Sequence, residues 1–205
     1  MVSPNTDILR ALREDNSHLK EENLKIKIEL TRLRQGLRSL MVLQNSLDKI
    51  TPQTEPMQLI DRILTVALQA VNSQDGSLML LDEETKELVF VHVLGAAQNR
   101  LKGYRLPRGE GIAGWVVANK TAKLVPDVKA EPQFSPLVDQ HTGFQTTSLI
   151  CVPLSEGKRT LGALEVVNTV SGEPFNQEDL DIMLLVARLS AIAIIKAEGI
   201  SPAKS

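Results

Sequence analysis

The first fifty residues carry a seven-residue repeat of apolar side chains that is typical of one structure, a coiled-coil helix. One series of positions is wholly aliphatic: Leu12, Leu19, Ile26, Leu33, Leu40 and Leu47. A second series, three positions earlier, reads Leu9, Asn16, Asn23, Leu30, Leu37 and Gln44. Together they occupy the d and a positions of consecutive heptads and form one continuous seam. Because no proline interrupts the segment between Pro4 and Pro52, the pattern predicts a single long helix.

The charges beside this seam predict what covers it. In a parallel pair of helices, each g position faces the e position five residues later in the partner. These pairs are all opposite in sign: Asp15 with Lys20, Glu22 with Lys27, and Glu29 with Arg34. Asparagines at a positions bond their own copies across a two-fold axis, which favours two parallel strands. We therefore expect a parallel homodimer through Leu9, Leu12, Asn16, Leu19, Asn23, Ile26, Leu30, Leu33, Leu37 and Leu40. The alternative is a helix that lies on its own globular domain.

The rest of the chain predicts a mixed domain of helices and strands. Helical apolar spacing occurs at 57–71, 112–119 and 177–198. Strand-like runs occur at 77–81, 87–94, 101–106, 122–125, 148–154 and 161–167. This order is that of an α+β fold with an antiparallel sheet of about five to six strands and helices on one face. We expect a coiled coil at 1–50, a domain at 51–198 and a flexible tail at 199–205.

Two local expectations follow from these runs. Simple alternation along the strand at 87–94 places Leu88, Phe90, His92 and Leu94 on one face. The long segment at 126–145, rich in Pro, Gln, Asp and Gly, is expected to be a loop.

Six short motifs follow one another along this domain: 106–116 (LPRGEGIAGWV), 125–128, 131–134, 147–154, 161–168 and 175–179. In this order the set resembles a GAF domain, the small-ligand sensory module of signalling proteins, over about residues 40–195. The resemblance implies a ligand pocket between the sheet and the loop at 126–145. The candidate lining residues are Tyr104, Gly111, Trp115, Asp127, Phe134, His141 and Thr147. For each of them, ordinary core or loop packing is the competing interpretation.

The same resemblance argues against one class of ligand. GAF domains that bind cyclic nucleotides carry Asn-Lys, then Phe, then Asp-Glu, and their Lys and Asp pair over the pocket. Asn168, Phe175 and Asp179 match this signature, but Thr169 replaces the Lys and Leu180 replaces the Glu. We expect neither cyclic GMP nor cyclic AMP to bind, and the ligand and any cofactor stay unidentified.

Motifs for catalysis or metal binding have little support. The lone cysteine, Cys151, lies in an apolar run, so we expect a buried thiol that cannot complete a dithiol cycle. His18, His92 and His141 show no metal-ligand spacing. The series Gly109-x-Gly111-x-x-Gly114 matches a dinucleotide fingerprint in form only, because a charged stretch ending in proline precedes it. A tight turn with close helix packing is the preferred interpretation of these glycines.

Composition and hydropathy exclude further partners. A formal net charge of −2 argues against nucleic acid, which needs a concentrated basic face. The longest apolar stretch, 182–195, is broken by Arg188 and is too short for a bilayer span of about 20 residues. With a single cysteine and no leader segment, the reducing cytoplasm is the expected compartment.

We therefore expect a non-enzymatic, dimeric sensory or adaptor protein in signal transduction. It would bind a small ligand or a separate signalling protein and pass the signal through the helical dimer. The alternative is a structural coiled-coil scaffold whose domain takes no ligand and contacts only protein. Polar residues facing an open cavity would favour the sensor, and a packed, dry interior would favour the scaffold. Ten residues follow Ile195, so we expect either a separate module or part of a longer receptor.

Overall fold

The computed structural model describes residues 4–47 and 55–197. The expected boundary between the coiled coil and the domain, at 50/51, and the expected tail at 199–205 lie outside these ranges. Two compact units divide between Gln35 and Gly36, and each is described by itself.

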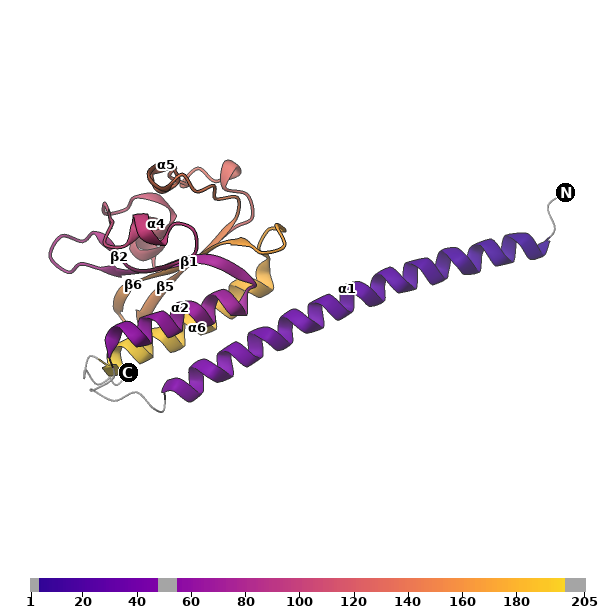
Figure 1. The fold of residues 1–205 in the computed structure, drawn as a ribbon, viewed down its shortest axis with the longest axis horizontal. Coiled ribbons are helices and arrows are strands. Elements are labelled where there is room, and N and C mark those ends of the chain that lie inside the picture. The colour runs from indigo at the N-terminus through magenta and orange to yellow at the C-terminus, as the bar shows by residue number, and fades with distance from the viewer. Residues whose placement is uncertain (1–3, 48–54, 198–205) are drawn as a thin grey trace. The chain divides into compact units, whose positions relative to one another are not determined.

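The first unit is the amino-terminal part of a single long helix, α1 (Pro4–Leu47), 44 residues long (Figure 1). The predicted long helix is therefore confirmed, while the coiled coil remains a prediction. The seam side chains of this unit are exposed to solvent in the single chain. Leu9, Leu12, Leu19 and Ile26 keep between 55% and 61% of their surface accessible. Such a row of large apolar side chains on one helix needs a cover to be stable in water.

The second unit is built on a six-stranded sheet in which every pair of neighbours is antiparallel. Its strands are β1 (Ser73–Leu81), β2 (Leu88–Leu94), β3 (Arg105–Leu106), β4 (Lys123–Val125), β5 (Leu149–Glu156) and β6 (Arg159–Thr169). The order across the sheet is β3-β2-β1-β6-β5-β4. The last strand in the chain thus lies in the middle, between β1 and β5.

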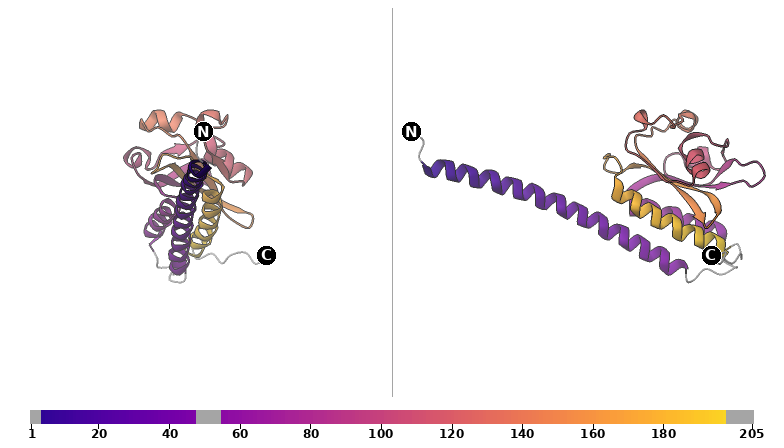
Figure 2. Two further views of the ribbon diagram at one scale, coloured as in Figure 1. Left: turned by 90° about the vertical axis from the view of Figure 1, so that its right-hand side faces the viewer. Right: turned by 180° about the vertical axis from the view of Figure 1, so that it is seen from behind.

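Helices cover both faces of this sheet, as the two directions of view show (Figure 1 and Figure 2). The long helices α2 (Pro56–Ala70) and α6 (Gln177–Ala197) lie side by side on one face, as the sequence predicts. The other face carries the short helices α3 (Gln98–Leu101), α4 (Gly111–Asn119), η1 (Val128–Ala130) and α5 (Leu137–Thr142). The segment at 126–145, expected to be a loop, therefore contains two short helices.

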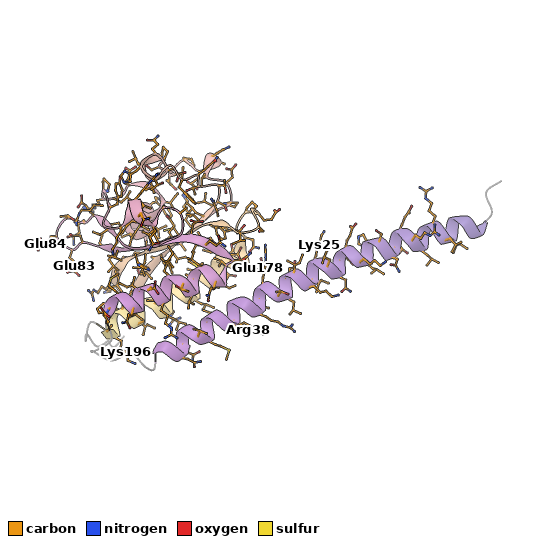
Figure 3. All side chains as sticks on the ribbon, viewed as in Figure 1. Lys25, Arg38, Glu83, Glu84, Glu178 and Lys196 are labelled. Atoms are coloured by element: carbon orange, nitrogen blue, oxygen red, sulfur yellow. The ribbon has the colours of Figure 1, made fainter. Side chains whose placement is uncertain are left out.

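Two apolar cores result, one on each side of the sheet. The first lies between the sheet and the pair α2/α6 and includes Ile63, Leu164 and Met183, each fully buried. Leu40, near the end of α1, packs against this core. The second core lies under the short helices and includes Phe90, Val116 and Cys151 (all side chains in Figure 3). Helix α6 meets both the sheet and α2, which buries Met183, Val186 and Ile194, while Leu184 and Leu185 stay exposed.

A β-bulge in β2 overturns the expected face of this strand. Leu78 pairs with His92 and Met79 with Phe90, so Val91 is an extra residue. One inserted residue reverses the alternation of every side chain beyond it. His92 consequently lies on the α2 side, with Nε2 2.8 Å from Oδ1 of Asp61. The expectation that Leu88, Phe90, His92 and Leu94 share one face was wrong, and Val93 joins Leu88 and Phe90 in the second core.

The expected strand at 101–106 was also wrong over most of its length. Leu101 ends α3, and the strand itself comprises Arg105–Leu106, although Gly103 and Tyr104 still make backbone hydrogen bonds to Phe90 of β2. Gly103 adopts φ +79°, a left-handed conformation that turns the chain between these two elements. What remains of the strand is the edge of the sheet.

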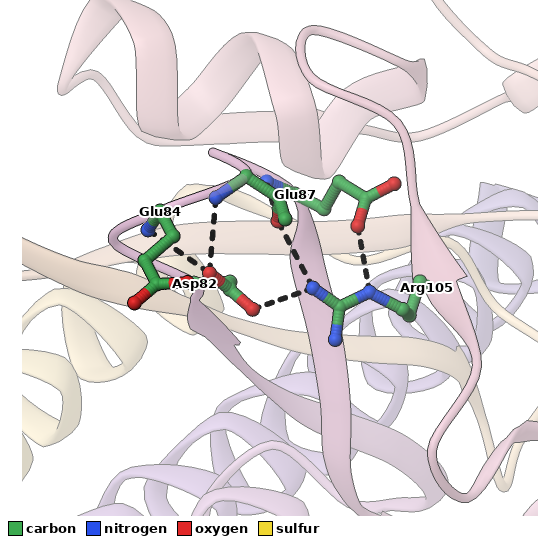
Figure 4. Close-up of polar contacts among 5 residues, drawn as sticks. Asp82, Glu84, Glu87 and Arg105 are labelled. Atoms are coloured by element: carbon green, nitrogen blue, oxygen red, sulfur yellow. Dashed lines mark hydrogen bonds and ion pairs between the residues drawn. The ribbon is translucent and has the colours of Figure 1, made fainter.

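That edge is held by a charged cluster around Arg105 (Figure 4). Its guanidinium lies 2.5 Å from Oδ2 of Asp82 and 2.6 Å from Oε2 of Glu87. Asp82 also accepts hydrogen bonds from the backbone N–H groups of Glu84 and Thr85, both at 3.0 Å. Chiefly because Arg105 hydrogen-bonds it, the pKa of Asp82 falls to about 2. The cluster ties β3 to the β1–β2 hairpin, whose tip residues Glu83 and Glu84 point away from the core (Figure 3).

Candidate functional site

A cavity lies between the sheet and the short helices, on the face away from α2 and α6. The sheet supplies its floor: Ser77, Met79, Phe90, Val93, Leu149, Glu165 and Val167. The cover comes from α3, from α4 and from the segment at 134–146: Ala97, Leu101, Gly111, Ile112, Ala113, Phe134, Ser135, Val138, Asp139, Thr142, Phe144 and Thr146. The space open to the centres of water molecules is about 80 Å³, several times the ~10–15 Å³ that one water needs on this scale.

Glu165 is the charged residue at the middle of the floor. It lies on the central strand β6, directly opposite Ser77 of β1 and Cys151 of β5. Burial raises its pKa to about 7, the charge of Asp139 acts in the same direction, and a hydrogen bond with the Cys151 thiol opposes them. A carboxyl group with such a pKa exchanges its proton near neutral pH.

Cys151 is fully buried beside Glu165, as the sequence predicts. Burial raises the pKa of its thiol well above the ordinary value, and the Glu165 carboxylate adds to this effect. Because the thiolate is the nucleophilic form, a thiol in this environment is a poor nucleophile.

Two other carboxylates reach the cavity, and both bind protein groups. Both oxygens of Asp139 accept hydrogen bonds from Thr146, from its N–H at 2.9 Å and from its hydroxyl at 2.8 Å. Oδ1 of Asp75 accepts the N–H of Ala96 at 2.7 Å. Among the described residues that line the cavity, none is a lysine, arginine or histidine. The cavity is thus apolar with an acidic character.

Contacts outside the cavity hold its cover in place. The Arg100 guanidinium, on α3, donates to the carbonyl oxygen of Thr142 at the end of α5. In the other direction, Nε2 of His141 lies 3.2 Å from the carbonyl oxygen of Arg100. The His141 ring also packs against Tyr104, with ring centroids 4.8 Å apart. These contacts join α5 to α3 and to the turn that leads into β3.

The structure brings two of the seven sequence-predicted pocket residues to the cavity wall, Gly111 and Phe134. Tyr104 packs edge-on against Phe90 in the second core, with ring centroids 6.1 Å apart, and His141 lies against its ring. Trp115 packs into the second core, and the Lys123 ammonium lies 4.7 Å from its ring centroid.

The remaining two candidates organise loops. Asp127 caps η1, accepting the N–H of Lys129 at 2.9 Å. Thr147 donates its N–H and its hydroxyl to Oδ1 of Asn168, both at 2.8 Å. Asn168 has φ +53° and donates from its amide to the carbonyl oxygen of Gln145 at 2.9 Å. This asparagine therefore fastens the end of the 126–145 segment to β6.

Sequence reasoning missed Glu165, Asp75 and Asp139. Glu165 carried a usable signal, because it is the one charged residue within the apolar run 161–167. Asp75 precedes the strand expected at 77–81, whereas β1 already begins at Ser73. No local pattern marks Asp139, which reaches the cavity through the fold of the 126–145 segment.

The glycine motif has the structural role that the sequence favoured. Gly109 and Gly111 have φ +78° and +62°, and a Cβ on Gly114 would lie 2.5 Å from the carbonyl carbon of Gly109. These positions need glycine for a left-handed turn and a close backbone approach.

Comparison with known proteins identifies the fold family. The family profile described as GAF domain matches residues 53–195. The chain belongs to the GAF domain family. Solved structures share this fold. The GAF domain from a phosphoenolpyruvate-protein phosphotransferase of Coxiella burnetii has a TM-score of 0.67 at 20% identity, covering 82% of this chain and 98% of that one. The free methionine-R-sulfoxide reductase of Neisseria meningitidis, in complex with its substrate, has a TM-score of 0.64 at 19% identity, covering 82% and 92%. A methyl-accepting chemotaxis protein fragment has a TM-score of 0.62 at 19% identity, covering 78% and 96%.

Sequence relatives of the GAF domain are found in phosphodiesterases. The mouse (Mus musculus) cone cGMP-specific 3',5'-cyclic phosphodiesterase subunit alpha' is 35% identical over 88 residues, 43% of this chain and 10% of the relative. The Bos taurus subunit is 37% identical over 76 residues, 37% of this chain and 9% of the relative. The chain thus spans about a tenth of the length of these relatives. The GAF domain, matched here over residues 53–195, is a sensory module of signalling proteins. GAF domains are generally regulatory, and the neighbours include GAF domains that belong to enzymes.

Within the described residues, 4–47 and 55–197, no helix combines the length and the apolar character of a membrane span. In the same ranges, no three His, Cys, Asp or Glu side chains gather in a way that could hold a metal ion.

Proposed function

We propose that this chain is a non-enzymatic, dimeric GAF sensor or adaptor that binds a small molecule in the cavity over β1 and β6. The observation that carries the proposal is the cavity itself, a mostly apolar space with Glu165 on its floor. A mostly apolar pocket with a few converging polar groups is the usual form of a small-molecule site. The same feature favours a sensor over a scaffold with a packed interior.

The chemistry around Cys151 supports binding rather than catalysis. The only thiol of the chain is fully buried, its pKa is raised, and it is hydrogen-bonded to Glu165. An activated cysteine needs a lowered pKa and access to substrate. The environment of Cys151 has the opposite properties.

The exposed seam of α1 supports a parallel homodimer. Its large apolar side chains lie in one row, and the flanking e and g charges are complementary between parallel copies. Covering Leu12, Leu19 and Ile26, each about 60% exposed, with a second copy would remove apolar surface from water.

Helix packing suggests how ligand binding in the cavity is linked to the dimer formed by α1. The floor strands of the cavity carry α2 and α6 on their opposite face, and Leu40 of α1 packs against the same core. A ligand that displaces β1 or β6 would therefore alter the packing beneath the end of α1. The output would be a change of helix register or tilt between the two copies, which a separate signalling protein would recognise.

A cavity-filling variant tests the proposal. Benzyl alcohol, titrated into the full chain and followed by ligand-observed NMR, is the probe. We expect binding to the unmodified chain and loss of binding in Ala97→Leu, because Ala97 lines the cavity. The matched control is Ala118→Leu, an exposed alanine on α4, which should bind like the unmodified chain. Equal signals from all three chains would overturn the assignment of the cavity.

A further inference from the structure

We propose that the cavity takes a compact molecule with a protonated nitrogen on an apolar body, and that Glu165 is the counter-charge of that nitrogen. This inference rests on the proposed function, because it names the ligand class of the same site. It follows from where the carboxylate stands, what already binds it, and which charges surround it.

The position of Glu165 directs its carboxylate at a ligand. It comes from the central strand of the sheet and lines the cavity, with Ser77 and Cys151 beside it on the neighbouring strands. Its hydrogen-bond donor within the protein is the Cys151 thiol, which is a weak donor. A carboxylate offers about four acceptor sites. Glu165 therefore retains acceptor capacity that a ligand N–H group can use.

The two other acids differ from Glu165 in the donors that they accept, because each takes a backbone N–H group rather than a weak thiol donor. Asp139 uses both oxygens on Thr146, and Asp75 accepts from the backbone of Ala96. Their bonds shape the cover and the rim, while their charges add to the negative potential of the cavity. This arrangement leaves Glu165 as the group that meets the ligand.

The surrounding charges exclude an anionic ligand group. Along the line of residues that crosses the strands through Glu165, the nearest cation is Lys123 of β4, which lies opposite Cys151 in the strand register. Its ammonium is 2.8 Å from Oε1 of Glu131 and lies over the Trp115 ring. A phosphate or carboxylate in the cavity would thus face Glu165 without a cationic partner among the lining residues, at a high cost in a medium of low polarity.

The apolar wall defines the rest of the ligand. Phe90 of β2, Ile112 of α4, Leu149 of β5 and Phe134 of the segment between η1 and α5 line the space above Glu165. With about 80 Å³ open to water centres, the cavity favours a single ring or a short aliphatic chain. An amine on such a body would bury its apolar part while its N–H groups bond the carboxylate.

The titration of Glu165 adds a dependence on pH. Its pKa is about 7 in the empty protein, and an ammonium beside it favours the ionised form. The facing ionisable groups are Asp75 of β1, Asp139 of α5, Cys151 of β5 and Lys123 of β4. The first three are acidic, so they do not replace the cation of the ligand. Amine affinity is expected to rise by about ten-fold from pH 6 to pH 8, as the ionised fraction of Glu165 rises.

Three probes with one ring test the charge requirement on the full chain at pH 8: benzylamine, benzyl alcohol and benzoate. We expect benzylamine to bind about ten-fold or more tightly than benzyl alcohol, and benzoate to bind most weakly. Glu165→Gln, which keeps the shape, should weaken benzylamine about ten-fold and change benzyl alcohol by less than about two-fold. Glu173→Gln, at an exposed position, is the matched control and should change neither.

Benzyl alcohol separates the two levels of the proposal. If benzyl alcohol binds and benzylamine binds no more tightly, the inference about the charge is wrong and the cavity remains a binding site. If none of the three probes binds, both proposals are wrong. The pH series needs no variant: a benzylamine affinity that is flat between pH 6 and pH 8 would also overturn the role of Glu165.

Discussion

Replacing Glu165 with glutamine should stabilise the protein at alkaline pH and do much less at acidic pH. The pKa of this carboxyl is 4.5 in an unhindered chain and about 7 in the fold. Because the folded pKa is the higher one, ionisation opposes folding. Its penalty is absent below pH 4.5 and grows as the pH rises through 7. At 1.36 kcal/mol for each pH unit of difference, the full effect is about 3 kcal/mol.

Comparing the unfolding free energy of Glu165→Gln with that of the unmodified chain isolates the contribution of this carboxyl group. Glutamine has the shape of the protonated carboxyl and no charge at any pH. The gain in unfolding free energy of Glu165→Gln over the unmodified chain should therefore increase by about 2.5 kcal/mol between pH 5 and pH 8. Titrating groups that do not interact with Glu165 contribute equally to both proteins and cancel.

Urea unfolding of the full chain provides the measurement. Trp115 is the only tryptophan and lies on α4 in the core above the sheet, so its fluorescence reports on the GAF domain. Protomer concentration must be held constant, because association adds to apparent stability. Glu173→Gln, at an exposed position, should show no such pH-dependent gain. A gain for Glu165→Gln that is the same at pH 5 and pH 8, or a loss at pH 8, would refute the reasoning.

Three more predictions test separate parts of the molecule. Ile26→Asp should weaken dimerisation about 100-fold in sedimentation equilibrium, whereas Leu24→Asp should not. Both side chains are 61% exposed in the single chain, so equal effects on dimerisation would contradict the assignment of Ile26, and not Leu24, to the dimer seam. Arg105→Gln should raise the pKa of Asp82 from about 2 toward 3.8 in an NMR titration, because the guanidinium is the main cause of the lowered value. An unchanged pKa would show that the backbone N–H groups dominate. Calorimetric titration with cyclic GMP should give a dissociation constant above about 10 μM, since the lining residues supply no cation for its phosphate, and tighter binding would refute this.

Local patterns in the sequence were sufficient for the elements and the family. The heptads predict α1 because helix periodicity depends only on spacing along the chain. The apolar run around Cys151 predicts a buried strand for a similar reason, and the motifs from 106 to 179 identify the GAF domain in their order. In each case the information lies within a few residues of the element that it specifies.

The site itself was decided by contacts between distant parts of the chain. Glu165, Ser77 and Cys151 meet because β6 inserts between β1 and β5, and that register is set by pairing across the whole domain. The bulge at Val91 exists only relative to β1, yet it turns Val93 toward the cavity. The pKa of Glu165 depends on burial under segments far along the chain. A sequence records which residues carry chemistry, but their neighbours, and hence their charge state, arise only when the strands pair and the short helices close over them.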